Sequence, residues 1–392
     1  MFKNSISIIG GTGHVGLPLG LAFSRKKFKV HLIDLNHKHI EIVNKGIFPF
    51  MEKKGDKILK TALKKKKIYA SSDISLIKSS KYIIICIGTP IKNNLKPELN
   101  YFLNFFKNLK KNLNKNQIII IRSSVFPGTC NKVYKILYSK NKNIVYCPER
   151  IVQGKSLIEL SKLPQIVSGF SEIAKNEASI LFKNITKKII FSSILEAELI
   201  KLFSNAYRYI HFSISNDFYK ICHAFNINYE NLRKKMIDGY ERNTAIPRAG
   251  FTAGPCLLKD TMQLASFTKK KFDLGYAAMN INQNLPIFLI KELEKKTNLK
   301  KHTIGILGMS FKAEVDDARD SLSIHLISYL KRRKIKYLYH DPYYKSLENV
   351  NLKKLINKST ILVVSTPHEM YKKIKIPKKK ILIDIWNIIN YR

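Results

Sequence analysis

Cysteine is scarce in this chain: five cysteines occur among 392 residues, with no CxxC pair and no cluster of cysteine with histidine. An odd number without regular spacing favours a reducing compartment over a disulfide framework, so we expect a cytoplasmic protein without a bound metal. Apolar runs are also short, and none approaches the roughly 20 residues of a membrane-spanning helix. Because a strand-turn-helix pattern begins at Ser5, the sequence predicts neither a signal peptide nor membrane insertion.

Acidic residues are few as well, with 28 against 70 lysines and arginines and a formal net charge of +42. This charge attracts polyanions at low salt. However, only 11 of the basic residues are arginine, the side chain that binds phosphates and bases with two hydrogen bonds. The lysines are spread over every segment, which indicates a general preference for lysine. We therefore expect no specific nucleic-acid partner; the alternative is a polyanion-binding protein whose affinity collapses as salt rises.

The chain opens with the pattern of a dinucleotide-binding turn. A strand at 5–9 precedes Gly11-Thr-Gly13-His14-Val15-Gly16, and a second strand at 29–33 ends at Asp34. The three glycines suit a tight turn, close approach of a pyrophosphate and helix–strand packing, with the phosphates at a helix N-terminus. Asp34 follows Gly16 by 34 − 16 = 18 residues, where a carboxylate accepts hydrogen bonds from a ribose diol and repels a 2′-phosphate. The pattern predicts NAD as the cofactor.

Three further apolar strands run directly into polar segments. The strands expected at 82–87, 117–121 and 143–146 lead to Thr89, to Ser124 and to Glu149-Arg150. Open parallel sheets bind ligands at the carboxyl ends of their strands. The repetition predicts a binding site at this edge of the sheet.

From about Ser192 the pattern becomes helical. Helical periodicity over 195–224 places Lys201 and Asn205, four residues apart, on one face of a helix. A second helix is expected at 229–238, then a loop at 239–252, and a further helix runs to Lys296. Pro286 is expected to kink or restart that last helix.

Cys256 stands out within the helical part. It follows a Gly-Pro turn, with Lys259 three residues on and Asp260 four residues on. An ammonium nearby favours the thiolate, and a carboxylate can move protons for a water. The alternative from local sequence is a buried structural cysteine.

A second α/β pattern begins at His302, with strands expected at 303–307, 335–339, 361–364 and 381–383. Its glycine fingerprint is incomplete, so we expect no second NAD. Arg319 and Ser321 lie where a loop meets a helix and fit a diphosphate or cofactor contact. The predicted fold is α/β, with two Rossmann-like doubly wound parallel-sheet domains joined by a helical domain. The expected boundaries are 1–190 for NAD binding, 191–298 for the helical domain and 299–392 for nucleotide-sugar binding.

Seven motifs occur in an order that resembles the UDP-glucose/GDP-mannose dehydrogenase family across essentially the whole chain. They are Gly11-x-Gly13-x-x-Gly16, Gly88-Thr89-Pro90, Ser123-Ser124 with Pro127-Gly128, Pro148-Glu149-Arg150, Glu198-x-x-Lys201-x-x-x-Asn205, Gly254-Pro255-Cys256-x-x-Lys259-Asp260, and Phe311-Lys312 to Arg319-Asp320-Ser321. The resemblance implies oxidation of the C6 primary alcohol of a nucleotide sugar to a carboxylate, with two hydride transfers to NAD. It also implies a homodimer.

The resemblance implies roles residue by residue. Cys256 corresponds to the nucleophile, Lys201 and Asn205 to groups that steady an oxyanion, and Asp260 or Glu149 to the group that activates water. The implied cofactor contacts are the glycine turn and Asp34 together with Thr89, Ser124, Lys259 and Arg319. The implied substrate contacts are Arg150, Arg248, Phe251, Gly254 and Lys312, with Arg248 reaching the partner subunit's substrate.

The sequence departs from the family pattern at several positions. Ala253-Gly254-Pro255 is stiffer than the usual glycines, and Ser123-Ser124 replaces the usual Ser-Thr. Gln153 stands where glucose-type members often have a second carboxylate. Pro148-Glu149-Arg150 is typical of the 2-acetamido-sugar branch and Lys259–Thr261 of the glucose branch, so the sugar stays open between UDP-glucose and a UDP-N-acetylhexosamine.

Two rival functions remain at this level. A two-electron hydroxy-acid dehydrogenase also joins an NAD domain to helices, but it needs no thiol and forms one NADH per substrate. A non-catalytic nucleotide-sugar binding protein would need none of Cys256, Lys259 and Asp260. Counting NADH per substrate separates these from a four-electron oxidation.

Overall fold

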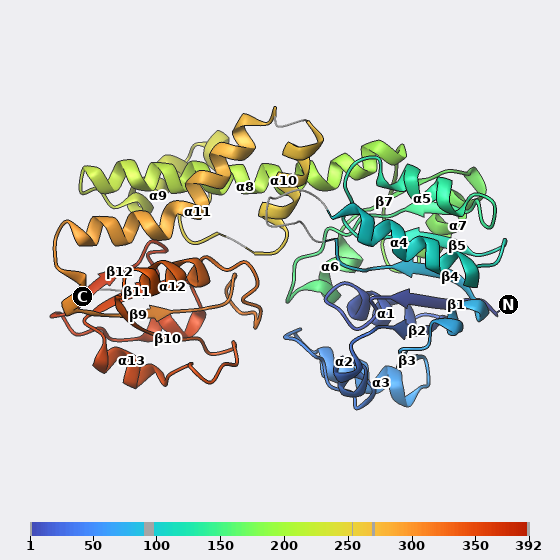
Figure 1. Ribbon diagram of the computed structural model, residues 1–392, viewed down its shortest axis with the longest axis horizontal. Coiled ribbons are helices and arrows are strands. Elements are labelled where there is room, and N and C mark those ends of the chain that lie inside the picture. The colour runs from blue at the N-terminus through green and yellow to red at the C-terminus, as the bar shows by residue number, and fades with distance from the viewer. Residues whose placement is uncertain (1, 90–97, 253, 269–270, 390–392) are drawn as a thin grey trace. The chain divides into compact units, whose positions relative to one another are not determined.

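The protein, described as a computed structural model, divides into two compact units, Met1–Ser204 and Asn205–Arg392 (Figure 1). The structure describes residues 2–89, 98–252, 254–268 and 271–389. Pro90 and Ala253, which belong to two of the sequence motifs, therefore lie outside the described residues.

An eight-stranded sheet forms the centre of the first unit, in the order β3-β2-β1-β4-β5-β6-β7-β8. All neighbouring strands are parallel except β6 and β7. The strands are β1 Phe2–Ile9, β2 Lys29–Ile33, β3 Ile68–Ser71, β4 Ser80–Ile85, β5 Ile118–Ile121, β6 Ile144–Tyr146, β7 Gln165–Gly169 and β8 Ile189–Phe191.

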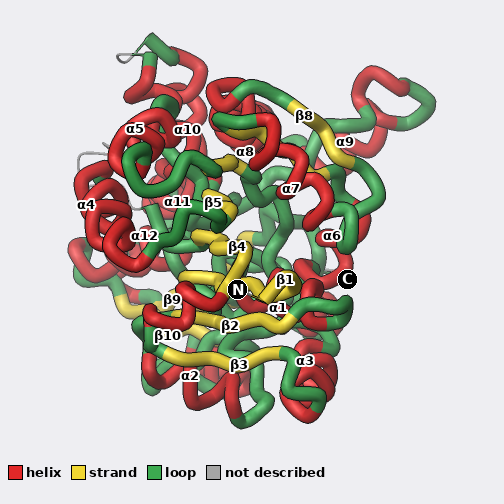
Figure 2. The backbone as a smooth tube through the Cα atoms, turned by 90° about the vertical axis from the view of Figure 1, so that its right-hand side faces the viewer, coloured by secondary structure: helices red, strands yellow, loops and turns green. Residues whose placement is uncertain are grey.

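Helices cover both faces of this sheet (Figure 2). They are α1 Gly16–Ser24, α2 His37–Asn44, α3 Gly55–Lys64, α4 Leu99–Leu109, α5 Thr129–Leu137, α6 Ser156–Lys162 and α7 Glu172–Phe182. Along β4, Ile84 belongs to the core under α1, α3, α6 and α7, whereas Ile83 and Ile85 belong to the core under α4 and α5. Successive side chains of a strand point to opposite faces, so the three isoleucines at the end of β4 contribute to both cores.

The second unit starts within the long helix α8 Ile194–Ala224, which begins in the first unit. Three helices follow: α9 Tyr229–Ile237, α10 Leu257–Phe267 and α11 Asp273–Glu294. Of the kink or restart expected at Pro286, the restart does not occur, because α11 continues through this proline. Its neighbours Leu285, Leu289 and Ile290 are buried in one core cluster, and this packing outweighs the roughly 3 kcal/mol that an internal proline costs a helix.

A four-stranded parallel sheet completes the second unit, in the order β10-β9-β11-β12. Its strands and helices are β9 Thr303–Leu307, α12 Leu322–Arg332, β10 Lys336–His340, α13 Leu352–Lys358, β11 Ile361–Val364 and β12 Ile381–Ile383. Apolar residues of α11 and α12 cover one face, and Leu355 of α13 packs on the other. Ser321 caps α12 by accepting a hydrogen bond from the Ser323 N–H, at the predicted start of this helix.

The predicted fold class is confirmed: two parallel sheets of Rossmann-like topology with a helical region between them in sequence. The boundaries at 190 and 298 remain a prediction. Among the described residues, every helix is too short or too polar to cross a bilayer.

Candidate active site

The glycine turn after β1 has the shape that a dinucleotide needs. A side chain at Gly11 would lie 2.6 Å from the Leu32 Cα, and one at Gly16 would collide with the Gly10 carbonyl. Gly13, by contrast, has only the Gly10 oxygen near it, at 3.5 Å. Val15, the residue before α1, makes no side-chain capping hydrogen bond, so the N–H groups of the first turn can bind a pyrophosphate that approaches over Gly13.

Asp34 lies beside this turn. Its carboxylate accepts hydrogen bonds from the Thr12 N–H (3.0 Å) and the Asn36 N–H (3.1 Å), which fixes it at the end of β2. Next to the turn, the centroids of the His14 and Phe50 rings lie 4.0 Å apart. Nε2 of His14 lies 3.5 Å from Nε2 of Gln153. These residues fit an adenosine ribose and a pyrophosphate, and hence NAD.

The loops after β4 and β5 are joined by hydrogen bonds. The Thr89 hydroxyl donates to the Ser124 carbonyl, and the Ser123 hydroxyl donates to the Ile87 carbonyl at 2.7 Å. The structure therefore brings the predicted pair Thr89 and Ser124 together at the carboxyl edge of the sheet.

Glu149 is held by an arginine that the sequence analysis missed. Arg122, 2% exposed, donates from Nε (2.9 Å) and Nη2 to Oε2 of Glu149, and from Nη1 to Oε1 of Gln165 at 2.9 Å. The other oxygen of Glu149 accepts from the N–H groups of Arg150 (2.7 Å) and Ile151 (3.0 Å). Both carboxylate oxygens are thus engaged, which suits an anchored anion better than a mobile base. The only sequence signal for Arg122 is a charge directly after four isoleucines.

Arg150, a predicted substrate contact, donates from Nη2 to the Pro164 carbonyl at 2.6 Å. Lys201 is 8% exposed on α8. One turn before it, Glu198 is fully buried and accepts from the N–H groups of Gly128 (2.6 Å) and Cys130 (2.9 Å) at the start of α5. Burial raises the pKa of the Glu198 carboxyl. Glu198 therefore holds α8 against α5 and fixes the position of Lys201 in the first unit.

In the second unit, Cys256 immediately precedes α10 and is exposed, whereas Cys130, Cys147 and Cys222 are buried and Cys86 is half-buried. Desolvation raises the pKa of Cys86 and of Cys147 to about 12. It also raises the pKa values of Cys130 and Cys222. Burial and raised pKa values make those four thiols poor nucleophiles, and its exposure makes Cys256 the accessible one.

Polar groups gather on the first turn of α10. Asp260 is fully buried; its Oδ2 accepts from Nδ2 of Asn205 at 2.6 Å, and its Oδ1 lies 3.5 Å from Nζ of Lys259. The predicted residues Asn205, Lys259 and Asp260 therefore form one cluster next to Cys256. This cluster can hold a negative charge and move a proton.

The loop before Cys256 packs on the loop after β9. Gly254 has φ +111°, and a side chain there would lie 2.5 Å from the Phe311 ring. Its N–H donates to the Asp320 carbonyl at 3.3 Å. Phe251 is buried at 4% exposure in the core cluster of this unit, which suits support of the loop rather than open contact with a ligand.

Two predicted arginines of this unit already have acidic partners. Arg319 makes hydrogen bonds to both oxygens of Asp317, with Nη2 at 2.6 Å from Oδ2. The pKa of Arg319 is raised, chiefly by its hydrogen bonds to Asp317. Arg248 lies 3.1 Å from Glu230.

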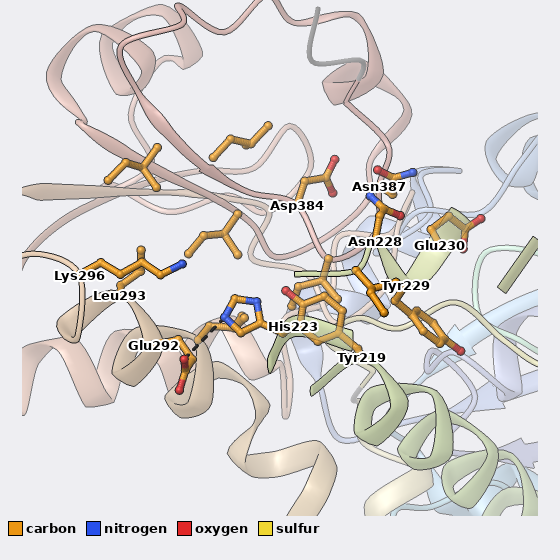
Figure 3. A pocket seen from close by; sticks show the side chains of 16 residues that line it. Tyr219, His223, Asn228, Tyr229, Glu230, Glu292, Leu293, Lys296, Asp384 and Asn387 are labelled. Atoms are coloured by element: carbon orange, nitrogen blue, oxygen red, sulfur yellow. Dashed lines mark ion pairs between the residues drawn. The ribbon is translucent and has the colours of Figure 1, made fainter. Parts of the chain in front are cut away.

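A cavity of about 450 Å³ lies elsewhere in the second unit, among α8, α9, α11 and the turn after β12 (Figure 3). Glu230 and the His223–Glu292 pair, 3.7 Å apart, line it. None of the predicted catalytic residues lines this cavity. Within the described residues, no group of three or more His, Cys, Asp or Glu side chains is placed to hold a metal ion.

Comparison with known proteins identifies the family. Three domain models of the UDP-glucose/GDP-mannose dehydrogenase family match: the NAD binding domain over 4–189, the central domain over 195–284 and the UDP binding domain over 305–391. UDP-N-acetyl-D-mannosamine dehydrogenase from Pyrococcus horikoshii is 28% identical over 97% of this chain and 94% of its own length. UDP-glucose 6-dehydrogenase from Rickettsia bellii is 26% identical, with coverage of 97% and 94%.

The fold comparison agrees. A solved structure of UDP-D-ManNAc dehydrogenase from Pyrococcus horikoshii superimposes with a TM-score of 0.91 at 26% identity, covering 99% of this chain and 96% of the other. The chain belongs to the UDP-glucose/GDP-mannose dehydrogenase family and is an NAD-dependent nucleotide-sugar dehydrogenase.

Proposed function

We propose that this enzyme oxidises the C6 primary alcohol of a UDP-linked sugar to the carboxylate in two oxidations, with Cys256 as the covalent nucleophile. The observation that carries the proposal is the chemistry around Cys256. This thiol is exposed while burial raises the pKa values of the other four, and it borders the cluster of Asn205, Lys259 and Asp260. A single oxidation of an alcohol would need no such thiol.

The role of the Cys256 sulfur follows from the bonds that form and break in the two oxidations. The first oxidation removes a hydride and a proton from the alcohol and leaves an aldehyde. The Cys256 sulfur adds to the aldehyde carbon, forming a C–S bond and a thiohemiacetal. Loss of a second hydride from carbon and of the hydroxyl proton gives a thioester, and water then cleaves the C–S bond to release the carboxylate and the thiol. Bound NAD supplies the hydride acceptor for each oxidation.

The remaining residues act on charge and protons. We assign Lys201 and Asn205 to the tetrahedral oxyanion, a role in which one preorganised donor is typically worth about 3 kcal/mol. We assign Asp260 to the proton of the attacking water. Gly11, Gly13, Gly16 and Asp34 hold the cofactor. Arg150, Arg248 and Lys312 are proposed to bind the anionic substrate, and Arg319 is proposed as a cofactor contact.

A panel of nucleotide sugars, each assayed for NADH formation, tests this function. We favour UDP-N-acetyl-D-mannosamine, the substrate named for the Pyrococcus horikoshii relative, over UDP-glucose, named for the Rickettsia bellii relative. The panel should include UDP-N-acetylglucosamine and GDP-mannose as controls. With limiting sugar and excess NAD, we expect two NADH per sugar consumed. One NADH per substrate would instead support a two-electron dehydrogenase, and no NADH with any sugar would overturn the proposal.

We further propose that the enzyme is a homodimer assembled through α8. The exposed large apolar side chains of this helix include Tyr207, Ile214, Phe218 and Ile221, and exposed Phe225 follows directly after its last residue. Their spacings of seven, four, three and four residues place them on one seam of the helix, as in helix pairs. Exposure of these five apolar side chains to water is unfavourable, so we expect a second copy of the chain to bury them.

The seam is tested with Phe218→Glu/Ile221→Lys. This double variant should convert a dimer to a monomer, because charges on the seam would be desolvated at the interface. Size-exclusion chromatography with light scattering measures the mass. Leu347→Glu is the matched control, since Leu347 is a fully exposed apolar residue elsewhere in the second unit. A parent protein with the mass of one chain would contradict the proposal.

A further inference from the structure

The loop between β9 and α12 carries Lys312, one of the proposed substrate contacts, and Arg319, a proposed cofactor contact. Its first residues are fixed to the end of β10: the N–H groups of Met309 and Ser310 donate to Oδ2 of Asp341 at 2.7 and 2.9 Å. Its middle closes on itself through a hydrogen bond from the Phe311 N–H to the Asp317 carbonyl at 2.9 Å.

His368 lies beneath this loop and has no role in the proposed reaction. It is completely buried, immediately before the 3₁₀ helix Glu369–Lys373. Its Nε2 lies 3.1 Å from Oδ2 of Asp341, and its Nδ1 lies 3.1 Å from the backbone nitrogen of Glu314. A backbone N–H can only donate, so Nδ1 accepts and Nε2–H donates to Asp341. His368 therefore links the loop to the end of β10.

Glu314 needs such a link because its backbone is strained. Its φ is +58°, in the left-handed region that a glutamate enters only at a cost. The Glu314 N–H donates to Nδ1 of His368. The Glu314 carboxylate accepts from the Glu369 N–H at 2.9 Å and from the Tyr343 hydroxyl at 2.5 Å. His368, Tyr343 and the 3₁₀ helix that follows His368 thus hold the backbone turn at Glu314, two residues after Lys312.

The same loop also touches the segment that carries Cys256. The Phe311 ring packs against Gly254, and the Asp320 carbonyl accepts from the Gly254 N–H. A shift of the turn at Glu314 would therefore move Lys312 directly and displace Phe311 from Gly254.

We propose that His368 is a positioning residue for the nucleotide part of the substrate: its Nδ1 holds the Glu314 turn and thereby sets Lys312 and Phe311 in their binding positions. This inference rests on the proposed function, because it assumes that the loop binds the nucleotide. His368 contacts no substrate in this account and acts through the loop alone.

Two substitutions separate the two nitrogens of His368. Asparagine places its amide near the position of Nδ1, and glutamine places its amide near the position of Nε2. His368→Asn keeps an acceptor for the Glu314 N–H and loses the bond to Asp341. His368→Gln keeps the bond to Asp341 and loses the acceptor for the loop. The two variants are matched controls for each other, because both replace the imidazole with a buried amide.

The readouts are the Kd for UDP alone, by calorimetry on the full-length protein, and KM and kcat for the sugar found in the panel. For His368→Gln we expect Kd and KM to rise about tenfold, the value of one lost hydrogen bond, with kcat little changed. For His368→Asn we expect both constants to stay within a factor of about two to three of the parent.

Equal losses in both variants, or no change in either, would overturn the positioning role. If the parent itself fails to bind UDP, the proposed function fails at its substrate step, and the inference falls with it. A parent that binds UDP while both variants bind equally well rejects the role of His368 and leaves the proposed function intact.

Discussion

Cys256→Ala should abolish formation of the acid while leaving the fold and NAD binding intact. Without the sulfur, the aldehyde has no covalent anchor and no route to a thioester, so we expect the rate of acid formation to fall by roughly a thousandfold or more. Acid product is measured by anion-exchange chromatography, and NAD binding by calorimetry.

The reaction of the protein with a thiol reagent provides the control for Cys256→Ala. In the parent, a thiol reagent at neutral pH should react quickly with Cys256 alone, because burial raises the pKa values of the other four cysteines. Cys222→Ala removes one of those buried thiols from α8 and should keep both the fast-reacting thiol and the activity. An alanine variant at 256 that still makes acid at close to the parent rate would rule out the covalent mechanism.

The sheets and the glycine turn could be predicted because their signals are local. The strand predicted at 117–121 is apolar at every position after Gln117, which indicates burial on both faces, and β5 covers 118–121 of it. The acid at position 34 was placed by spacing alone, and the structure puts its carboxylate on the glycine turn. The predicted helix does run past Pro286, but it does not restart there, because tertiary packing and not the local signal decides that case.

The pairs that build the site could not be read from the sequence. Arg122 and Glu149 are separated by 27 residues, and His368 and Asp341 also by 27. Each pair forms only because parallel strands bring their carboxyl ends to one edge of a sheet. A buried arginine and a buried histidine have no local pattern that sets them apart from surface residues. Their partners become evident only when the strand order is known.

Asp260→Asn should stall the enzyme after both hydrides have left. The parent carboxylate is held by Asn205 at 2.6 Å and lies 3.5 Å from Lys259, and only as a carboxylate can it take a proton from water. An amide of the same shape cannot do so. General-base catalysis is worth roughly 100-fold to 10,000-fold, so thioester hydrolysis should slow by that factor. The variant should then give a rapid burst of NADH followed by a slow steady state.

Intact-protein mass spectrometry of quenched reactions should show the acyl group covalently attached to Asp260→Asn enzyme. Glu149→Gln is the matched rival, because Glu149 is the other carboxylate implied as the base. Its two oxygens already accept hydrogen bonds from Arg122 and from the N–H groups of Arg150 and Ile151. We therefore expect Glu149→Gln to raise KM without accumulating the thioester. The reverse pattern, with the adduct on Glu149→Gln and none on Asp260→Asn, would transfer the role of base to Glu149.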